Sequence, residues 1–145
     1  MTHAAIARWL LVFLCGAQGA ATLAIDLNRT HATNPHWPRH ARFHLVWQSF
    51  SYAWLCVLEI ALIVAPGPVP DQRFYLAAIL ASIPMLSCLA AFACRRIYGG
   101  ALSDANGIPP VKVVMFGSEL HVDLNLASEA AALVFLLGIL AFFRH

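Results

Sequence analysis

Histidine is concentrated in one short segment of this chain. Residues 31–44 hold four of the seven histidines in a sequence of 145 residues, namely His31, His36, His40 and His44. Imidazole changes its charge near neutral pH and is a common ligand of zinc, iron and copper. His40 and His44 are four residues apart, so a helix would present both rings on one face. The segment is therefore predicted to bind a metal ion or to carry protons, with all four histidines as candidate metal ligands.

Carboxylates that could complete such a site lie on both sides of the histidine segment. Asp26 precedes it, and a later segment supplies Glu119, His121 and Asp123. Three or four of these groups could hold a divalent zinc, iron or copper ion. A pair of one histidine and one carboxylate could instead transfer protons as general acid and base, without a metal. The candidate catalytic residues are Asp26, His40, His44, His121 and Asp123.

Other polar and aromatic side chains are candidates for contacts with a substrate. Arg42 could bind an anionic or oxygen-bearing group. Glu129 would either interact with the dipole of the last helix or belong to the site. The alternative interpretation is that the histidines, like Trp37 and Trp47, lie at the headgroup level and bond to backbone and lipid. The candidate substrate-binding residues are Asn34, Trp37, Arg42, Gln48 and Glu129.

The composition indicates which elements must position these side chains. Hydrophobic residues make up 61% of the chain, charged residues 11%, and the mean hydropathy is +0.72, which is incompatible with an ordinary soluble domain. A membrane span needs about 20 apolar residues, and four stretches qualify, at about residues 6–27, 43–64, 74–94 and 124–143. We therefore predict an all-α integral membrane protein, with residues 1–145 forming one domain, a four-transmembrane-helix bundle.

The distribution of lysine and arginine predicts the orientation of this bundle. The first and third connections carry six of the nine basic residues, and the opposite side carries three. By the positive-inside rule, the histidine-rich first connection is cytoplasmic, in the inner (cell) membrane of a bacterium. An alternative is that the first stretch is a signal peptide cleaved near Ala17 or Ala20. In either case spans two, three and four put the first and third connections on the same side.

Two of the predicted spans carry polar stripes. The second span is predicted to begin at Pro38, because proline is tolerated in the first turn of a helix. On the first span, Gln18, Thr22 and Asp26 recur every four residues. Polar groups that faced lipid would be costly, so the two stripes should face each other or a shared cavity. The polar residues that share one sector of the second span are His40, His44, Gln48, Ser51, Tyr52 and Glu59.

The third connection is predicted to contain a short β-hairpin. Polar and apolar residues alternate over residues 119–126, which is the period of a strand with one polar face. Residues 111–116 could pair with this strand across a turn at Gly117 and Ser118. An isolated hairpin is marginal in water. We therefore expect it to lie on the histidine segment and to bring its acidic residues and His121 to the site.

One segment resembles a known family of proteins. It reads NPHWPRHARFH at residues 34–44, and it is accompanied by Asp26, Asn28 and the later runs DANGIPP and VDLN. Together they resemble a family of small four-span membrane proteins of bacteria and fungi with an N-P-x-W-P-x-H-A-R-F-H signature and no assigned activity. The resemblance covers nearly the whole chain but supplies no reaction. It implies a signature element of Asn34, Pro35, Trp37, Pro38, His40, Ala41, Arg42, Phe43 and His44.

Three functions fit these patterns. The leading hypothesis is a membrane-embedded enzyme that acts on a lipophilic small molecule from the bilayer, through a histidine and aspartate site at one membrane face. The alternative is a non-catalytic protein that binds a lipid, a quinone or a metal ion, or that serves a partner complex. A haem-carrying electron-transfer bundle ranks last, because axial ligands are needed on facing helices and the fourth span contains no histidine. The net charge of +2 does not suggest a nucleic-acid partner.

Overall fold

The computed structural model describes residues 2–103 and 107–144, so three residues of the DANGIPP run lie outside the described part. Within it, four helices are long and apolar enough to cross a membrane. This confirms the prediction of a mainly helical fold with four helices able to span a membrane. The helices are α1 (His3–Asp26), α2 (Arg39–Val64), α3 (Pro70–Cys94) and α4 (Leu124–Phe143).

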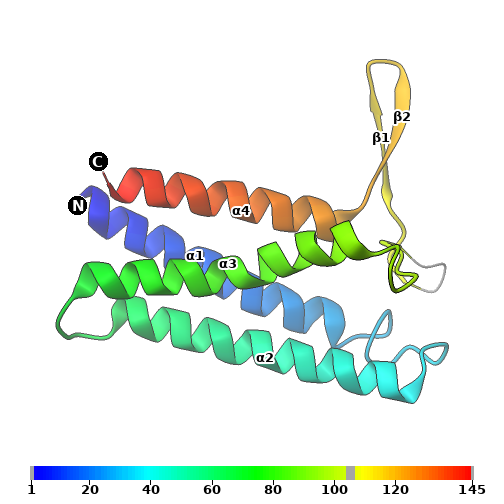
Figure 1. The fold of residues 1–145 in the computed structure, drawn as a ribbon, viewed down its shortest axis with the longest axis horizontal. Helices are drawn as coiled ribbons and strands as arrows, with labels where there is room; N and C mark the ends of the chain where they lie inside the picture. Colours follow the sequence, from blue (N-terminus) through cyan, green and yellow to red (C-terminus); the bar gives the residue numbers. More distant parts are fainter. Residues whose placement is uncertain (1, 104–106, 145) are drawn as a thin grey trace.

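The helices run alternately up and down and form a closed ring of neighbours. Each helix contacts the next along the chain, and α4 contacts α1. The first and third connections therefore lie at one end of the bundle, and the two termini lie together at the other (Figure 1). The predicted common side of the two connections is confirmed. We refer to these as the histidine end and the terminal end of the bundle.

The helix boundaries follow local signals in the sequence. Pro38 is the N-cap residue of α2, and the helix begins one residue later than predicted, at Arg39. Asp123 caps α4, because its side chain accepts a hydrogen bond from the backbone N–H of Leu126. Pro84 lies inside α3, where its ring removes one backbone hydrogen bond and favours a kink.

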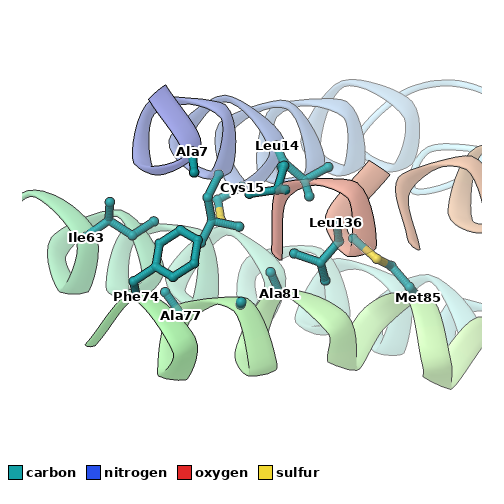
Figure 2. Close-up of a cluster of buried hydrophobic side chains, with 12 residues drawn as sticks. Ala7, Leu14, Cys15, Ile63, Phe74, Ala77, Ala81, Met85 and Leu136 are labelled. Carbon is teal, nitrogen blue, oxygen red and sulfur yellow. The ribbon is translucent and has the colours of Figure 1, made fainter. Parts of the chain in front are cut away.

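The apolar core lies towards the terminal end and the middle of the bundle. Figure 2 shows Ala7, Ile63 and Phe74 among its buried side chains. The Phe74 ring stacks on Phe143 with centroids 3.9 Å apart. Arg8 lies over both of these rings and forms an ion pair with Asp71 at 2.9 Å. The terminal half of the bundle is thus closed by packed side chains.

The predicted hairpin is present, with strands β1 (Val111–Met115) and β2 (Ser118–Val122). Its turn is not at Gly117 and Ser118 as predicted, because Met115 pairs with Ser118. The two turn residues are Phe116 and Gly117, with φ of 51° and 79°. Positive φ at both central residues of a two-residue turn matches the twist of the two strands. The sequence pattern therefore predicted the turn one residue too late in the chain.

The expected position of the hairpin is wrong. It stands out sideways from the histidine end, away from the bundle and from the connection between α1 and α2 (Figure 1). Alternation of polar and apolar residues gives a strand its two faces, but it does not give the direction in which the strand leaves a helix. Glu119 and His121 consequently face each other and Lys112 rather than the histidine segment.

Candidate functional site

A partly open cavity of about 740 Å³ lies between the four helices in the half of the bundle nearest the histidine end. All four helices and the first connection contribute to its wall. The polar side chains that line it are Gln18, Thr22, Asp26, His31, Gln48, Tyr52, Ser87, Cys88, Asn125, Ser128 and Glu129. The predicted stripe of the first span therefore shares a cavity with Gln48 and Tyr52 of the second span, as expected from the cost of exposing polar groups to lipid. The other members of the second stripe do not line this cavity, namely His40, His44, Ser51 and Glu59.

Asp26 is fixed in this cavity by a contact between two helices. The hydroxyl of the fully buried Ser49 on α2 lies 3.1 Å from Oδ2 of Asp26 on α1 and donates to it. The same hydroxyl lies 2.8 Å from the carbonyl oxygen of Leu45. One hydroxyl proton can serve only one acceptor at a time. Asp26 therefore has an anchored oxygen and a second oxygen for other partners.

The other helices add polar groups to the opposite wall. Asn125, Ser128 and Glu129 of α4 are at helical spacing and line the cavity with Ser87 of α3. Oε2 of Glu129 is buried and has no hydrogen-bond partner among the described residues. We predicted Glu129 as a substrate-binding residue, but not the rest of this group. The spacing of Asn125, Ser128 and Glu129 on one face of the fourth span is the signal that could have identified them.

The first connection is held by a network of short-range hydrogen bonds. Oδ1 of Asn28 accepts from both the backbone N–H and the hydroxyl of Thr30. Oγ1 of Thr30 lies 2.7 Å from Nδ1 of His31. The His31 ring meets Trp37 edge to face at 5.2 Å, and both residues line the cavity. The local geometry thus orients one histidine of the segment towards the cavity.

Asn34, a candidate substrate-binding residue, has a structural position in this connection. It is 3% exposed, its amide donates to the carbonyl oxygen of Thr30, and its side-chain oxygen accepts from the backbone N–H of His36. These bonds link the two halves of the connection. The buried amide therefore supports the conformation in which His31 and Trp37 reach the cavity.

The other histidines of the segment lie outside the cavity wall. His36, His40 and His44 are all exposed, and none of them lines the cavity. The predicted pairing of His40 and His44 on one helical face is present, with their Nε2 atoms 2.9 Å apart. The His44 ring also stacks on Trp47 at 5.8 Å. The pair lies on the first turns of α2, which begins at Arg39, and His44 directly precedes the cavity-lining Leu45.

The remaining predicted site residues are also separated from the cavity wall. Arg42 is half-buried on α2, Asp123 caps α4, and His121 lies on the projecting hairpin, 3.4 Å from Glu119. Gln48, by contrast, lines the cavity together with the substrate-binding candidates Trp37 and Glu129, and its amide donates to the Tyr52 hydroxyl at 3.2 Å. Over residues 2–103 and 107–144, no group of three histidine, cysteine or acidic side chains is placed to hold a metal ion. The predicted ligands are thus not brought together.

Comparison with protein-family models, with curated proteins and with solved structures found no match to this chain. The function must therefore be argued from the geometry of the cavity. The resemblance to a four-span family stays a prediction.

Proposed function

We propose that this protein is a membrane-embedded enzyme that takes a lipophilic small molecule into the interhelical cavity and transfers protons at its polar end. Asp26 and His31 are the proposed proton-carrying groups. Both side chains line the cavity, so an imidazole and a carboxylate could each exchange a proton with a molecule bound there.

The observation that carries this proposal is the composition of the cavity wall. A volume of about 740 Å³ is in the range of sites for small molecules. The apolar side chains of Leu14, Ala17 and Ala132 line the deeper part of the cavity and suit a hydrocarbon body, whereas Asp26 and His31 lie at the histidine end. A molecule that enters from the bilayer would therefore place its polar group against the proton-carrying pair and its chain towards the middle of the membrane.

Contacts in the cavity wall support the role of each proposed group. Ser49 holds one oxygen of Asp26, which leaves the other oxygen to accept a proton as a general base. Thr30 contacts Nδ1 of His31 and so can fix which ring nitrogen faces the cavity. The unpartnered oxygen of Glu129 on the opposite wall would accept a hydrogen bond from a substrate hydroxyl, which would satisfy a buried polar atom. The proposed proton transfer does not require a metal ion.

We also propose that the histidine end faces the cytoplasm of a bacterium. Six basic residues lie in or next to the two connections at this end and three lie near the terminal end, in agreement with the positive-inside rule. The test is a fusion of alkaline phosphatase to residue 145, because this reporter enzyme is active only outside the cytoplasm. Activity of this fusion would support the orientation, and inactivity combined with fluorescence of a matched green fluorescent protein fusion would reverse it.

The proposal is tested by solvent deuterium. The protein is reconstituted in nanodiscs with the lipid extract of the cells that express it, incubated in D2O, and the lipids are analysed by mass spectrometry. Proton transfer at carbon would add deuterium to one compound with the wild-type protein and not with Asp26→Asn. Absence of incorporation, together with a lipid that co-purifies stoichiometrically, would favour the non-catalytic binding protein.

A matched pair of substitutions tests the location. Ala132 lines the cavity, and its neighbour Ala131 is exposed on the same helix and does not. Ala132→Phe should displace the bound lipid and stop deuterium incorporation, while Ala131→Phe should change neither. If the two variants behave alike, the cavity is not the site.

A further inference from the structure

Glu59 is a buried acidic side chain that the proposed chemistry does not use. It lies on α2 towards the middle of the bundle and is 2% exposed. Its Oε1 is buried and has no hydrogen-bond partner among the described residues, and the same is true of Nε2 of Gln18 on α1. Leaving two such groups unpaired away from water is costly. An oxygen that accepts and an amide that donates are thus both without a partner in the same region.

The two unpartnered atoms belong to residues that line one small pocket. This pocket has a volume of about 10 Å³ and is also bounded by Cys15, Tyr52 and Pro84. A polar void of this size is at the lower limit for one water molecule. A single water could accept from the Gln18 amide and donate to Glu59, which would satisfy both groups.

Gln18 and Tyr52 are polar side chains that line both this pocket and the larger cavity, and of the two Gln18 has the unpartnered buried atom. On the other side of Glu59 lies the apolar core, which includes Leu11, Ile63 and Phe74. The titratable side chains that face Glu59 are Cys15 from α1 and Cys56 and Tyr52 from α2, and the α3 residue of the pocket is Pro84. The polar route out of the pocket therefore leads towards the histidine end.

We propose that one internal water joins Gln18 to Glu59, and that Glu59 stores a proton that it exchanges with the large cavity. The water link is inferred only from the residues of the small pocket. The use of Glu59 as a proton source for a substrate rests in addition on the proposed function. The two therefore fail separately. Deuterium incorporation into lipid tests the function, and exchange at the Glu59 carboxyl tests the link.

The experiment is infrared spectroscopy of the protein in nanodiscs. Comparison of the wild type with Glu59→Gln assigns the carbonyl band of the Glu59 carboxylic acid, and transfer to D2O reports its exchange by the shift of this band. We expect exchange in the wild type and, in Gln18→Met, exchange slowed by about tenfold or more, because one hydrogen-bonded link is lost. Ser128→Ala is the control, since Ser128 lines only the large cavity and its hydroxyl bonds to the carbonyl oxygen of Asn125 in its own helix, and it should exchange like the wild type.

Two results would overturn the inference. One is a Glu59 band that does not exchange in the wild type, and the other is a Gln18→Met variant that exchanges at the wild-type rate. Should Gln18→Met not fold, Gln18→Glu is the second variant. Gln18→Glu keeps a polar group at the position, so the Glu59 carboxyl should exchange at the wild-type rate. Blocked exchange at Glu59 in this variant would contradict the link.

A second inference concerns the projecting hairpin and rests on its register. Residues that are paired across antiparallel strands share a face, and successive pairs alternate between faces. One face holds Val111 with Val122, Val113 with Leu120, and Met115 with Ser118. The opposite face holds Lys112, Glu119 and His121, which are linked by contacts of 2.8 and 3.4 Å, together with Val114.

The apolar face is largely exposed in the described chain. Leu120 and Met115 are each 53% exposed, and Phe116 at the turn is fully exposed. The hairpin joins the bundle at the start of α4 and extends sideways from there, across the direction of the helix axes (Figure 1). An element in this position runs along the plane of a membrane that the four helices would cross.

We infer that the hairpin lies on the bilayer surface, with Val113, Met115 and Leu120 against the acyl chains and Lys112 and Glu119 towards water. A surface of this kind supplies the support that an isolated hairpin lacks. Segregation of one apolar and one charged face is the pattern of elements that lie in the membrane interface.

Spin labels test the inference in the full chain with its cysteines replaced by alanine, in vesicles of phosphatidylcholine and phosphatidylglycerol. A label at Leu120→Cys should collide with oxygen in lipid and be protected from a water-soluble nickel chelate. A label at Glu119→Cys, its sequence neighbour on the opposite face, should show the reverse. Equal access of the chelate to both labels would overturn the inference, and would leave the hairpin in water or available to a protein partner.

Discussion

The hydroxyl of Ser49 lies 3.1 Å from Oδ2 of Asp26 and joins α2 to α1 at the wall of the cavity. Ser49 has no exposed surface, while Asp26 is half-buried. A carboxylate near the end of a membrane-spanning helix is thus held by a buried group of the neighbouring helix. The contact couples the packing of the two helices to the position of the proposed general base.

Ser49→Ala should weaken both the bundle and the proposed reaction. The substitution removes the hydrogen bond to Asp26 and leaves its oxygen without that partner, which should cost about 1–2 kcal/mol of the free energy of unfolding. Unfolding in mixed detergent micelles measures the change. Ser51→Ala is the control, because the Ser51 hydroxyl is exposed and bonds only to the carbonyl oxygen of Trp47 in its own helix. An equal loss in both variants would contradict the role of the Asp26 contact.

Gly19 should tolerate no larger side chain, because it is the point of close approach between α1 and α2. A Cβ atom at this position would lie 2.8 Å from Cβ of Cys56. Gly19→Ala should therefore destabilise the bundle by about 1–3 kcal/mol through overpacking. Gly16→Ala is the matched control, since nothing lies within 4 Å of the added Cβ, and alanine favours the helix.

Cys56→Gly removes the atom that Gly19→Ala would meet, so the double variant separates packing from other effects. The added cost of Gly19→Ala should be smaller in the Cys56→Gly background than in the wild type. Thermal unfolding of the four proteins in one detergent gives the coupling between the two sites. Additive effects would show that the close approach of Cys56 does not limit the size of the side chain at position 19.

The apolar stretches predict the four helices well, because crossing a bilayer demands length and hydrophobicity, which composition records directly. The polar stripe of α1 also leads to the cavity, since Gln18, Thr22 and Asp26 all line it. Helical spacing alone does not say how far α2 extends beyond the cavity. His40 and His44 lie on its first turns, so they share a face with Gln48 and yet do not reach the cavity wall.

Loop geometry explains the remaining differences. A histidine-rich segment offers four candidate ligands, but the hydrogen bonds of Asn28 and Thr30 turn only His31 towards the cavity. Such local bonds between side chain and backbone depend on the conformation of each residue, which a pattern of residue types does not give. The same holds for the hairpin, whose faces follow from alternation but whose direction depends on how the chain leaves α4.

Asn34→Ala should loosen the first connection and displace His31 without unfolding the bundle. Its amide and carbonyl groups bond to Thr30 and to the backbone of His36, and loss of a buried pair of this kind costs about 1–3 kcal/mol. Because the four helices contact one another independently of this connection, the cost should appear as local opening. Hydrogen exchange of residues 28–37 should increase while exchange in α1 stays slow. Faster exchange along all four helices would contradict this.

Replacing single histidines should distinguish the cavity from the histidine pair as the site. General acid–base catalysis contributes at least about a hundredfold, so His31→Gln should lower the rate of deuterium incorporation by that order. His40→Gln and His44→Gln should lower it by less than about threefold, because their exposed rings contact each other and lie outside the cavity wall. The purified variants should also be analysed for zinc, iron and copper. If His40→Gln and His44→Gln abolish turnover together with a stoichiometric metal, and His31→Gln does not, the reaction takes place at the histidine pair and the role assigned to the cavity is wrong.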